Sequence, residues 1–170
     1  MVYDFSRVNV LVVESTAEMF KLFRDVLAML SVPDRNIQAA YSCEEGYRTF
    51  CGGKHDIIIT DWLQNPDQGI ELIKRVRTSP ESPNRFVPVI MTAGSGHLMR
   101  VIKSRDAGVS EYLVKPFAAE ALAIRITRVI ERPRPFVVSP SYTGPERRLR
   151  MQSFEGLDRR VVKQEIEKEI

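Results

Sequence analysis

Five side chains that can carry chemistry follow closely behind short apolar runs of the chain. They comprise two acids, two hydroxyls and one amine: Glu14, Asp61, Ser15, Thr92 and Lys115. A carboxylate can act as a nucleophile or as a ligand for a hard cation, and an ammonium group can neutralise charge on a neighbouring oxygen. Side chains of these kinds, each just after an apolar run, are the strongest functional clue in the sequence.

The apolar runs themselves have the composition of β-strands that are buried on both faces. They are rich in Val and Ile and lack polar alternation, which suits the strands of a parallel sheet. Ile37–Ala40 is a further candidate strand with less support. The four clear runs are Val8–Val13, Asp56–Thr60, Val87–Met91 and Tyr112–Val114.

Longer stretches with helical spacing of apolar residues separate these runs. In the first stretch, Met19, Phe23, Leu27 and Leu30 recur at steps of three or four residues. Gly108 is well placed to end the fourth helix. Strand and helix alternate five times, which predicts an α/β fold, a parallel sheet with right-handed crossovers and helices on both faces. The other four predicted helices are Cys43–Phe50, Ile70–Arg77, His97–Asp106 and Ala118–Ile130.

The predicted sheet explains why the chemically useful residues follow the strands. In open parallel sheets, ligands bind beyond the carboxyl ends of the strands. Because those ends meet along one edge of the sheet, the acids, hydroxyls and amine named above are expected to share one pocket.

Length and composition fit one domain followed by a tail. The chain has 170 residues, 44% of them hydrophobic and 28% charged, and a formal net charge of +3. These values exclude a wholly disordered or fibrous chain. No apolar run approaches the roughly 18 residues that span a bilayer. The two cysteines are too few for a disulfide scaffold and lack metal-site spacing, so a cytoplasmic location is expected.

The composition changes near Arg132. From Arg132 to Arg150 the chain carries five basic residues, one acidic residue and four prolines, and prolines block the continuation of a helix. We therefore predict one domain over residues 6–131 and a Pro- and Arg-rich tail over residues 132–170. Within the tail, Arg159–Ile170 has the apolar spacing of a short amphipathic helix.

The tail also contains a short internal repeat. Residues 142–148 read Tyr-Thr-Gly-Pro-Glu-Arg-Arg, and residues 154–160 read Phe-Glu-Gly-Leu-Asp-Arg-Arg. Two copies favour a docking element that folds on a partner, on its own domain or on a second copy of the chain; a solvated tail is the alternative. Because acids alternate with the arginines, nucleic-acid binding is not expected.

Four segments of the chain resemble the receiver domain of bacterial two-component response regulators. Each is a strand with the residues that follow it, and in one of them Gly69 lies eight positions after Asp61. The resemblance covers about residues 6 to 131 and implies a flavodoxin-like, doubly wound sheet of five strands in the order 2-1-3-4-5. The segments are Val10–Val13 with the acid behind it, Ile57–Trp62, Val89–Ala93 and Tyr112–Phe117.

The resemblance implies a role for each residue at the strand ends. Asp61 is the expected phosphoacceptor, which takes a phosphoryl group from a histidine kinase or a phosphotransfer protein. Lys115 and Thr92 are expected to contact the phosphoryl oxygens, and Tyr112 is the expected switch aromatic, whose ring moves inward on activation. Such a protein is a switch rather than an enzyme: phosphorylation changes its affinity for a downstream protein partner. Homodimer formation stays open.

A Mg²⁺ ion is the expected cofactor. The resemblance implies that Glu14, Asp61 and the backbone carbonyl of Leu63 hold it. Receiver domains usually place two acids after the first strand, and here the second position is Ser15, whose neutral oxygen is a weaker ligand for a hard cation. The affinity for Mg²⁺ is therefore expected to be reduced.

The residues around Asp61 also predict slow loss of a phosphoryl group. Leu63, two residues past Asp61, is apolar, and Gly94, two residues past Thr92, has no side chain, so neither can hold a water for attack on an acyl phosphate. These departures leave a second interpretation open, a degenerate receiver that acts as a phosphorylation-independent adaptor. The presence of Lys115 together with Asp61 and Thr92 argues against this second interpretation, because an inactive site would not need all three residues.

Overall fold

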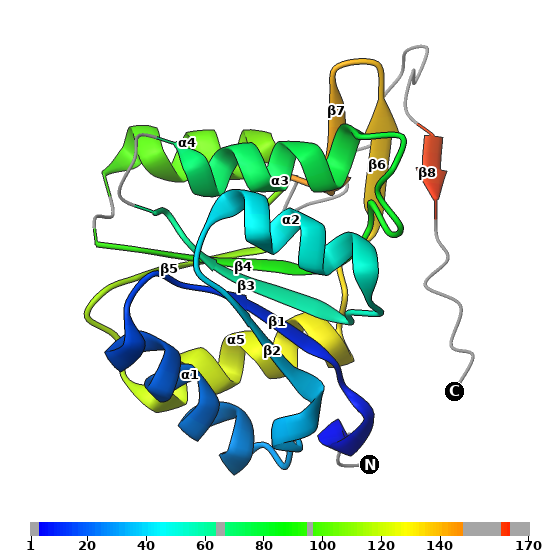
Figure 1. Ribbon diagram of the computed structural model, residues 1–170. Coiled ribbons are helices and arrows are strands. Elements are labelled where there is room, and N and C mark those ends of the chain that lie inside the picture. Colours follow the sequence, from blue (N-terminus) through cyan, green and yellow to red (C-terminus); the bar gives the residue numbers. More distant parts are fainter. Residues whose placement is uncertain (1–3, 64–66, 95–96, 148–160, 164–170) are drawn as a thin grey trace.

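The computed structural model describes residues 4–63, 67–94, 97–147 and 161–163, and its centre is a five-stranded parallel sheet (Figure 1). The spatial order is β2-β1-β3-β4-β5, which confirms the predicted flavodoxin-like arrangement. Each strand pairs in parallel with its neighbours. The strands are β1 (Val10–Val13), β2 (Ile37–Ala40), β3 (Ile57–Asp61), β4 (Val89–Ala93) and β5 (Glu111–Val114).

Five α-helices among the described residues cover the two faces of this sheet. α1 and α5 lie on one face, and α2, α3 and α4 lie on the other (Figure 1). All five correspond to predicted helices, with ends displaced by a few residues. None of the described helices has the length and apolar character needed to cross a membrane. They are α1 (Ala17–Met29), α2 (Cys43–Gly52), α3 (Gln68–Thr78), α4 (Leu98–Ala107) and α5 (Ala119–Glu131).

Both faces of the central strands are buried. Successive residues of a strand point to opposite faces. Leu11 and Val13 of β1 therefore belong to the core under α2 and α3, whereas Val10 and Val12 belong to the core under α1 and α5. All four side chains are fully buried. This double burial accounts for the unbroken apolar runs in the sequence.

The chain continues beyond α5 into a small antiparallel sheet. β6 (Phe136–Ser139) and β7 (Tyr142–Pro145) form a hairpin, and β8 (Val161–Lys163) pairs with the other edge of β6. The segment predicted as a tail thus contains sheet structure. The helix predicted over Arg159–Ile170 is wrong at the three residues of β8, and the rest of that range lies outside the described residues.

The hairpin was not predicted because its segment is rich in proline, and yet every one of its prolines lies where a hairpin tolerates one. Pro135 precedes β6, Pro140 lies in the turn and Pro145 ends β7, so none of them interrupts the middle of a strand. Between them, Phe136 and Val137 supply buried apolar side chains. The division of the chain into units at residue 131 stays a prediction.

Candidate functional site

The predicted site residues lie at the carboxyl edge of the sheet. Asp61 is the last residue of β3, and Thr92 lies opposite it in the register of β4. Glu14 directly follows β1 and Lys115 directly follows β5. Parallel strands bring all four positions to one edge, although up to 101 residues separate Glu14 from Lys115 in the sequence.

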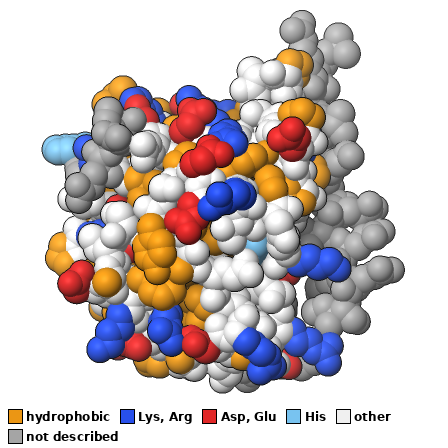
Figure 2. All heavy atoms as spheres, in the orientation of Figure 1, with side chains coloured by type: hydrophobic (Ala, Val, Ile, Leu, Met, Phe, Trp, Pro, Cys, Tyr) orange, Lys and Arg blue, Asp and Glu red, His pale blue; other side chains and the backbone are white. Residues whose placement is uncertain are grey.

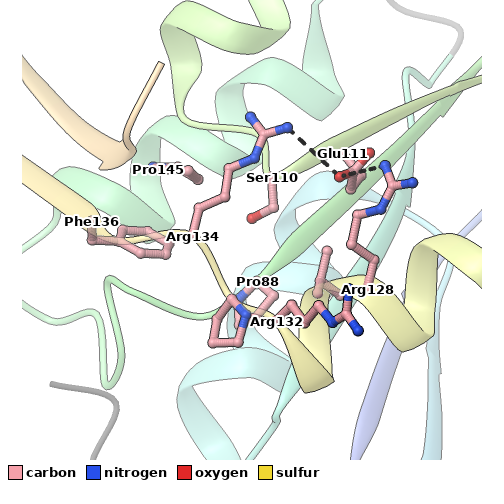
Figure 3. Close-up of a pocket in the computed structure, with 10 residues that line it drawn as sticks. Pro88, Ser110, Glu111, Arg128, Arg132, Arg134, Phe136 and Pro145 are labelled. Atoms are coloured by element: carbon pink, nitrogen blue, oxygen red, sulfur yellow. Dashed lines mark ion pairs between the residues drawn. The ribbon is translucent and has the colours of Figure 1, made fainter. Parts of the chain in front are cut away.

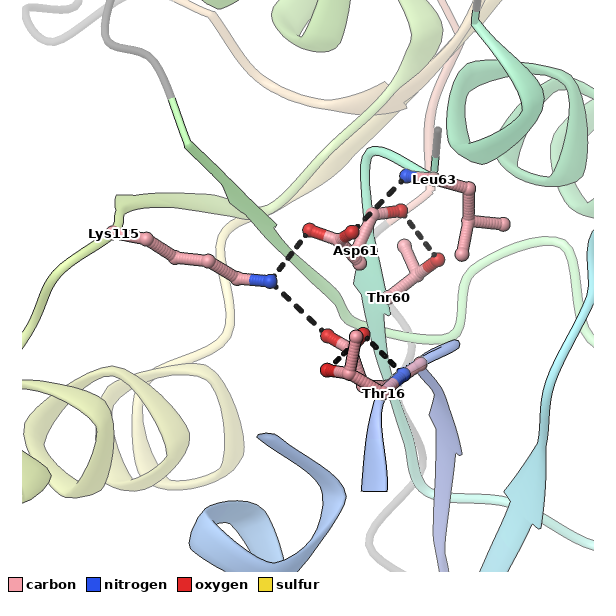
Figure 4. Close-up of polar contacts among 6 residues, drawn as sticks. Thr16, Thr60, Asp61, Leu63 and Lys115 are labelled. Carbon is pink, nitrogen blue, oxygen red and sulfur yellow. Dashed lines mark hydrogen bonds and ion pairs between the residues drawn. The ribbon is translucent and has the colours of Figure 1, made fainter. Parts of the chain in front are cut away.

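The ammonium group of Lys115 joins the two acids (Figure 4). Its Nζ lies 2.9 Å from Oδ1 of Asp61 and donates a hydrogen bond of 3.1 Å to Oε2 of Glu14. Burial lowers the pKa of Lys115, because it disfavours the charged form. The hydrogen bond to Asp61 and the negative charges of Asp61 and Glu14 raise it by more, so the pKa of Lys115 lies above its ordinary value. The three groups form a cluster of two negative charges around one fixed positive charge.

Thr16 holds the carboxylate of Glu14 in place. Oε1 of Glu14 accepts hydrogen bonds of 3.0 Å from both the backbone N–H and the hydroxyl of Thr16, the residue before α1. With Lys115 on its other oxygen, Glu14 is fixed, and its side chain is only 1% exposed. Sequence reasoning missed Thr16; its signal was a hydroxyl residue at a helix start, two positions after the acid.

The loop after β3 folds back closely over Asp61. The backbone N–H of Leu63 donates to Oδ2 of Asp61 at 3.3 Å, and the N–H of Gly69 donates to the carbonyl of Trp62 at 3.0 Å. A Cβ atom at Gly69 would lie 2.4 Å from the carbonyl oxygen of Asp61. Glycine is therefore required eight residues after the aspartate, because the first turn of α3 passes directly over it.

Thr92 presents a hydroxyl that has no hydrogen-bond partner among the described residues. Its side chain is fully buried, and its carbonyl accepts a hydrogen bond of 2.9 Å from the backbone N–H of Trp62. An unsatisfied buried hydroxyl costs about 1–3 kcal/mol. A ligand oxygen on Asp61 would remove that cost.

Tyr112 and α4 form one side of the site. Tyr112 lies on β5 opposite Met91. Burial raises the pKa of Tyr112, the positive charge of Arg100 lowers it, and the negative charge of Asp61 raises it. The guanidinium of Arg100 also lies 5.2 Å from the centre of the Trp62 ring. Sequence reasoning missed Arg100, since its spacing in α4 resembles that of any solvated helix face.

The oxygen donors at this edge of the sheet suit a hard cation, but only two of them, Glu14 and Asp61, are carboxylates, where receiver domains usually supply three acids. Glu14 and Asp61 both contact one ammonium group, so their carboxylates lie close enough together to share a hard cation as well. Ser15 is exposed and brings only a hydroxyl. Among the described residues, no group of three or more His, Cys, Asp or Glu side chains is arranged to hold a metal.

A small hollow of about 30 Å³ lies elsewhere, at the opposite end of β5 (Figure 3). There Arg128 and Arg134 approach Oε1 of buried Glu111 at 3.6 and 3.9 Å, and Arg125 donates to its Oε2 at 2.5 Å. The arginines balance a buried carboxylate. They tie the segment that leads into β6 to α5, so we assign this cluster to the fold.

The fold and the cluster of Asp61, Thr92 and Lys115 together define a class. A doubly wound sheet in the order 2-1-3-4-5, with its acids, hydroxyl and amine at the carboxyl edge, is the arrangement of receiver domains. Residues 10–127 match the family model described as "Response regulator receiver domain". The chain therefore belongs to the response regulator receiver domain family, and its signalling is of the two-component kind.

Curated relatives and solved structures agree with this assignment. Chemotaxis protein CheY1 of Helicobacter pylori strain J99 is 30% identical over 124 residues, which cover 72% of this chain and 96% of that protein. Chemotaxis protein CheY-3 of Vibrio cholerae serotype O1 is 29% identical, over 73% of this chain and 92% of that protein. A putative response regulator from Chloroflexus aurantiacus J-10-fl superposes with a TM-score of 0.65 at 27% identity, over 74% of this chain and 98% of that one.

Proposed function

We propose that Asp61 accepts a phosphoryl group from a phosphohistidine of a histidine kinase or phosphotransfer protein. A carboxylate oxygen of Asp61 attacks the phosphorus, the P–N bond to the donor imidazole breaks, and the electron pair leaves with the imidazole. The observation that carries this proposal is the ammonium of Lys115, 2.9 Å from Asp61 and 3.1 Å from Glu14. It is positioned to balance the charge that arrives with the phosphoryl group.

A bound Mg²⁺ ion would neutralise charge on the transferring group. Glu14, Asp61 and the carbonyl of Leu63 are the proposed ligands, and Ser15 contributes a weaker oxygen. Glu14 enters this role already oriented, because Thr16 fixes its second oxygen with two hydrogen bonds. The low charge of the set makes the reduced affinity for Mg²⁺ part of the proposal.

Thr92 and Tyr112 convert phosphorylation into a change of shape. The unpartnered hydroxyl of Thr92 gains an acceptor when a phosphoryl oxygen comes within reach. Its displacement toward Asp61 opens space beside Tyr112, which is half-buried on the neighbouring strand. Moving a two-state element from 1:99 to 99:1 takes about 5.5 kcal/mol of differential stabilisation. A few charge-assisted hydrogen bonds of about 1.5–3 kcal/mol each supply that amount.

Decay of the phosphorylated form is proposed to be slow. The side chain of Leu63 is apolar and only 5% exposed, and Gly94 offers no side chain. Neither position can orient a water toward the phosphorus. The half-life, followed by intact mass after removal of the donor, is expected to exceed minutes; loss within seconds would contradict this part of the proposal.

One experiment decides between a phosphoacceptor and a phosphorylation-independent adaptor. The full chain is incubated with a small phosphodonor and Mg²⁺, and its intact mass is followed. Asp61→Asn should abolish the gain of one phosphoryl group, whereas Asp25→Asn, an exposed acid on α1, should leave it unchanged. No gain in the unsubstituted chain, with an active control receiver in the same assay, would favour the adaptor.

The proposed output is a changed affinity for a downstream protein rather than turnover of another substrate. Acidic and basic side chains are interspersed over the face shown in Figure 2. Such a mixture of charges does not favour nucleic-acid binding, because a phosphate backbone is bound most tightly by a continuous patch of positive charge. The cytoplasmic location stays a prediction from the sequence, and homodimer formation stays open.

A further inference from the structure

We propose that the β6–β7 hairpin is a partner of the receiver's own α4, and that docking of the hairpin competes with phosphorylation of Asp61. This inference rests on the proposed function. It gives the receiver an internal partner, a segment of the same chain, whose affinity changes with the state of the aspartate.

The hairpin is packed against the end of the receiver formed by α3 and α4. The ring of Phe136 meets the ring of Phe86 edge-on, with centres 5.5 Å apart, and the guanidinium of Arg77 from α3 lies 5.0 Å from the Phe136 ring centre. Phe136 and Val137 are 5% exposed. The hairpin is thus held to the receiver by buried apolar surface.

A polar contact fastens β7 to the last turn of α4. The guanidinium of Arg147 stacks 3.7 Å above the ring of Tyr142 and donates a hydrogen bond of 2.7 Å to Asp106. The hydroxyl of Tyr142 in turn donates to the carbonyl of Pro145 at 2.8 Å. Tyr142, Pro145 and Arg147 belong to the first copy of the repeat found in the sequence, so the arginine of the repeat contacts α4 and its aromatic ring packs against that arginine.

Three other residues of the same helix contact the loop after Asp61 and the neighbouring strand β4. Arg100 lies over Trp62, and Lys103 pairs with Asp67 at 2.8 Å. The hydroxyl of Ser104 contacts the sulfur of Met91, the neighbour of Thr92, at 3.3 Å. α4 therefore contacts the surroundings of the site through Arg100, Lys103 and Ser104, and it contacts the hairpin through Asp106.

A change at Asp61 is transmitted because α4 is one short rigid helix. Its ten residues span about 15 Å. A phosphoryl group adds negative charge to Asp61, the residue before Trp62, and the guanidinium of Arg100 lies 5.2 Å from the centre of the Trp62 ring. The helix is displaced toward the new charge, and the contact between Asp106 and Arg147 is strained. By linkage, a docked hairpin then opposes phosphorylation to the same extent.

Two variants weaken docking from opposite sides of one contact. Arg147→Ala removes the ion pair and the stacking on Tyr142, and Asp106→Asn removes the charge on α4. Arg24→Ala is the matched control, because Arg24 also makes one exposed ion pair, 2.8 Å from Asp34, but lies on α1. The probe is beryllofluoride with Mg²⁺, a reversible mimic of the phosphoryl group, with binding read from the fluorescence of the single tryptophan, Trp62.

The expected result is tighter binding of the probe by about 1.5-fold to fivefold in Arg147→Ala, the range of the one exposed ion pair that joins the hairpin to α4. Asp106→Asn should act in the same direction, and the two changes should not add. Hydrogen exchange over residues 136–145 should accelerate when beryllofluoride binds to the unsubstituted chain. Arg24→Ala should change none of these readouts.

Failure of the inference is distinguishable from failure of the proposed function. A chain that gains a phosphoryl group and binds beryllofluoride, yet shows unchanged affinity in Arg147→Ala and unchanged exchange in the hairpin, refutes the coupling alone. Weaker binding in both variants also overturns it, since the sign would be cooperative. A chain that neither gains the phosphoryl group nor binds the mimic refutes both proposals.

Discussion

Arg77 joins three segments of the receiver directly beneath the hairpin strand β6, and its replacement by methionine tests how much this buried side chain stabilises the fold. The guanidinium is fully buried. Nη1 donates to the carbonyls of Val87 and Arg85 at 2.7 and 2.8 Å, and Nη2 and Nε donate to the carbonyl of Gly108 at 2.9 and 3.1 Å. The side chain therefore joins α3, the loop before β4 and the end of α4.

The expected loss of stability follows from two opposing magnitudes. Four hydrogen bonds from a charged donor are worth about 1.5–3 kcal/mol each, or about 6–12 kcal/mol in total. Burial lowers the pKa of Arg77 from 12.5 to about 9, which corresponds to a cost of about 5 kcal/mol for the charged form. The net contribution is a few kcal/mol. Because methionine also leaves three carbonyls without this donor, we expect Arg77→Met to lower the free energy of unfolding by about 3–5 kcal/mol.

Urea unfolding of the full chain measures this quantity. Arg48→Met, at an exposed position on α2, is the matched control and should change the free energy of unfolding by less than about 0.5 kcal/mol. Arg77→Lys should fall between the two, since one ammonium cannot reproduce the fork of donors. A loss below about 1 kcal/mol for Arg77→Met would refute the reasoning, because the hydrogen bonds would then merely offset the cost of burial.

Three further predictions concern the site and the core. Gly69→Ala should cost about 2–4 kcal/mol in urea unfolding and reduce phosphoryl uptake, because the new methyl would meet the carbonyl oxygen of Asp61 at 2.4 Å; normal uptake would contradict this. Ser15→Asp should raise Mg²⁺ affinity at least about tenfold in a tryptophan fluorescence titration, whereas the neutral Ser15→Asn should not. His55 is 7% exposed and burial lowers its pKa from 6.5. As the pH falls, the unfolded chain therefore binds the proton before the folded chain does. The free energy of unfolding should be highest above about pH 6.5 and should fall below it, and the fall should be less steep in His55→Gln. An equally steep fall in both chains would contradict this.

The sequence predicted the sheet and its site edge because each is encoded locally. Double burial leaves an unbroken apolar run such as Val10–Val13, and parallel topology then brings Glu14 and Lys115 together without any further information. The contacts that fix side chains within the site were harder to predict. Thr16 reads in sequence as an ordinary helix start, and its two bonds to Glu14 depend on the exact path of the chain after β1.

The hairpin was not predicted because the contacts that hold it to the receiver are distant in sequence. Phe136 packs on Phe86, fifty positions earlier, and Arg147 reaches Asp106 on α4. The composition of a segment rich in proline and arginine does not indicate which distant residues it contacts. The burial of His55 has a cause of the same kind: its hydrogen bond of 2.6 Å with Gln38 joins two segments that only the folded sheet brings together.

Gly108 shows that the receiver portion is itself adapted to the hairpin. Its φ of 95° ends α4, as the sequence predicted. A Cβ atom there would also lie 2.7 Å from the carbonyl oxygen of Thr143 on β7 and 3.1 Å from Nε of Arg77. A helix end alone would tolerate asparagine, which adopts positive φ. The approach of β7 excludes every side chain. The requirement for glycine at this position therefore comes from the hairpin as well as from the helix, and the two portions of the chain are fitted to each other at the turn where α4 ends.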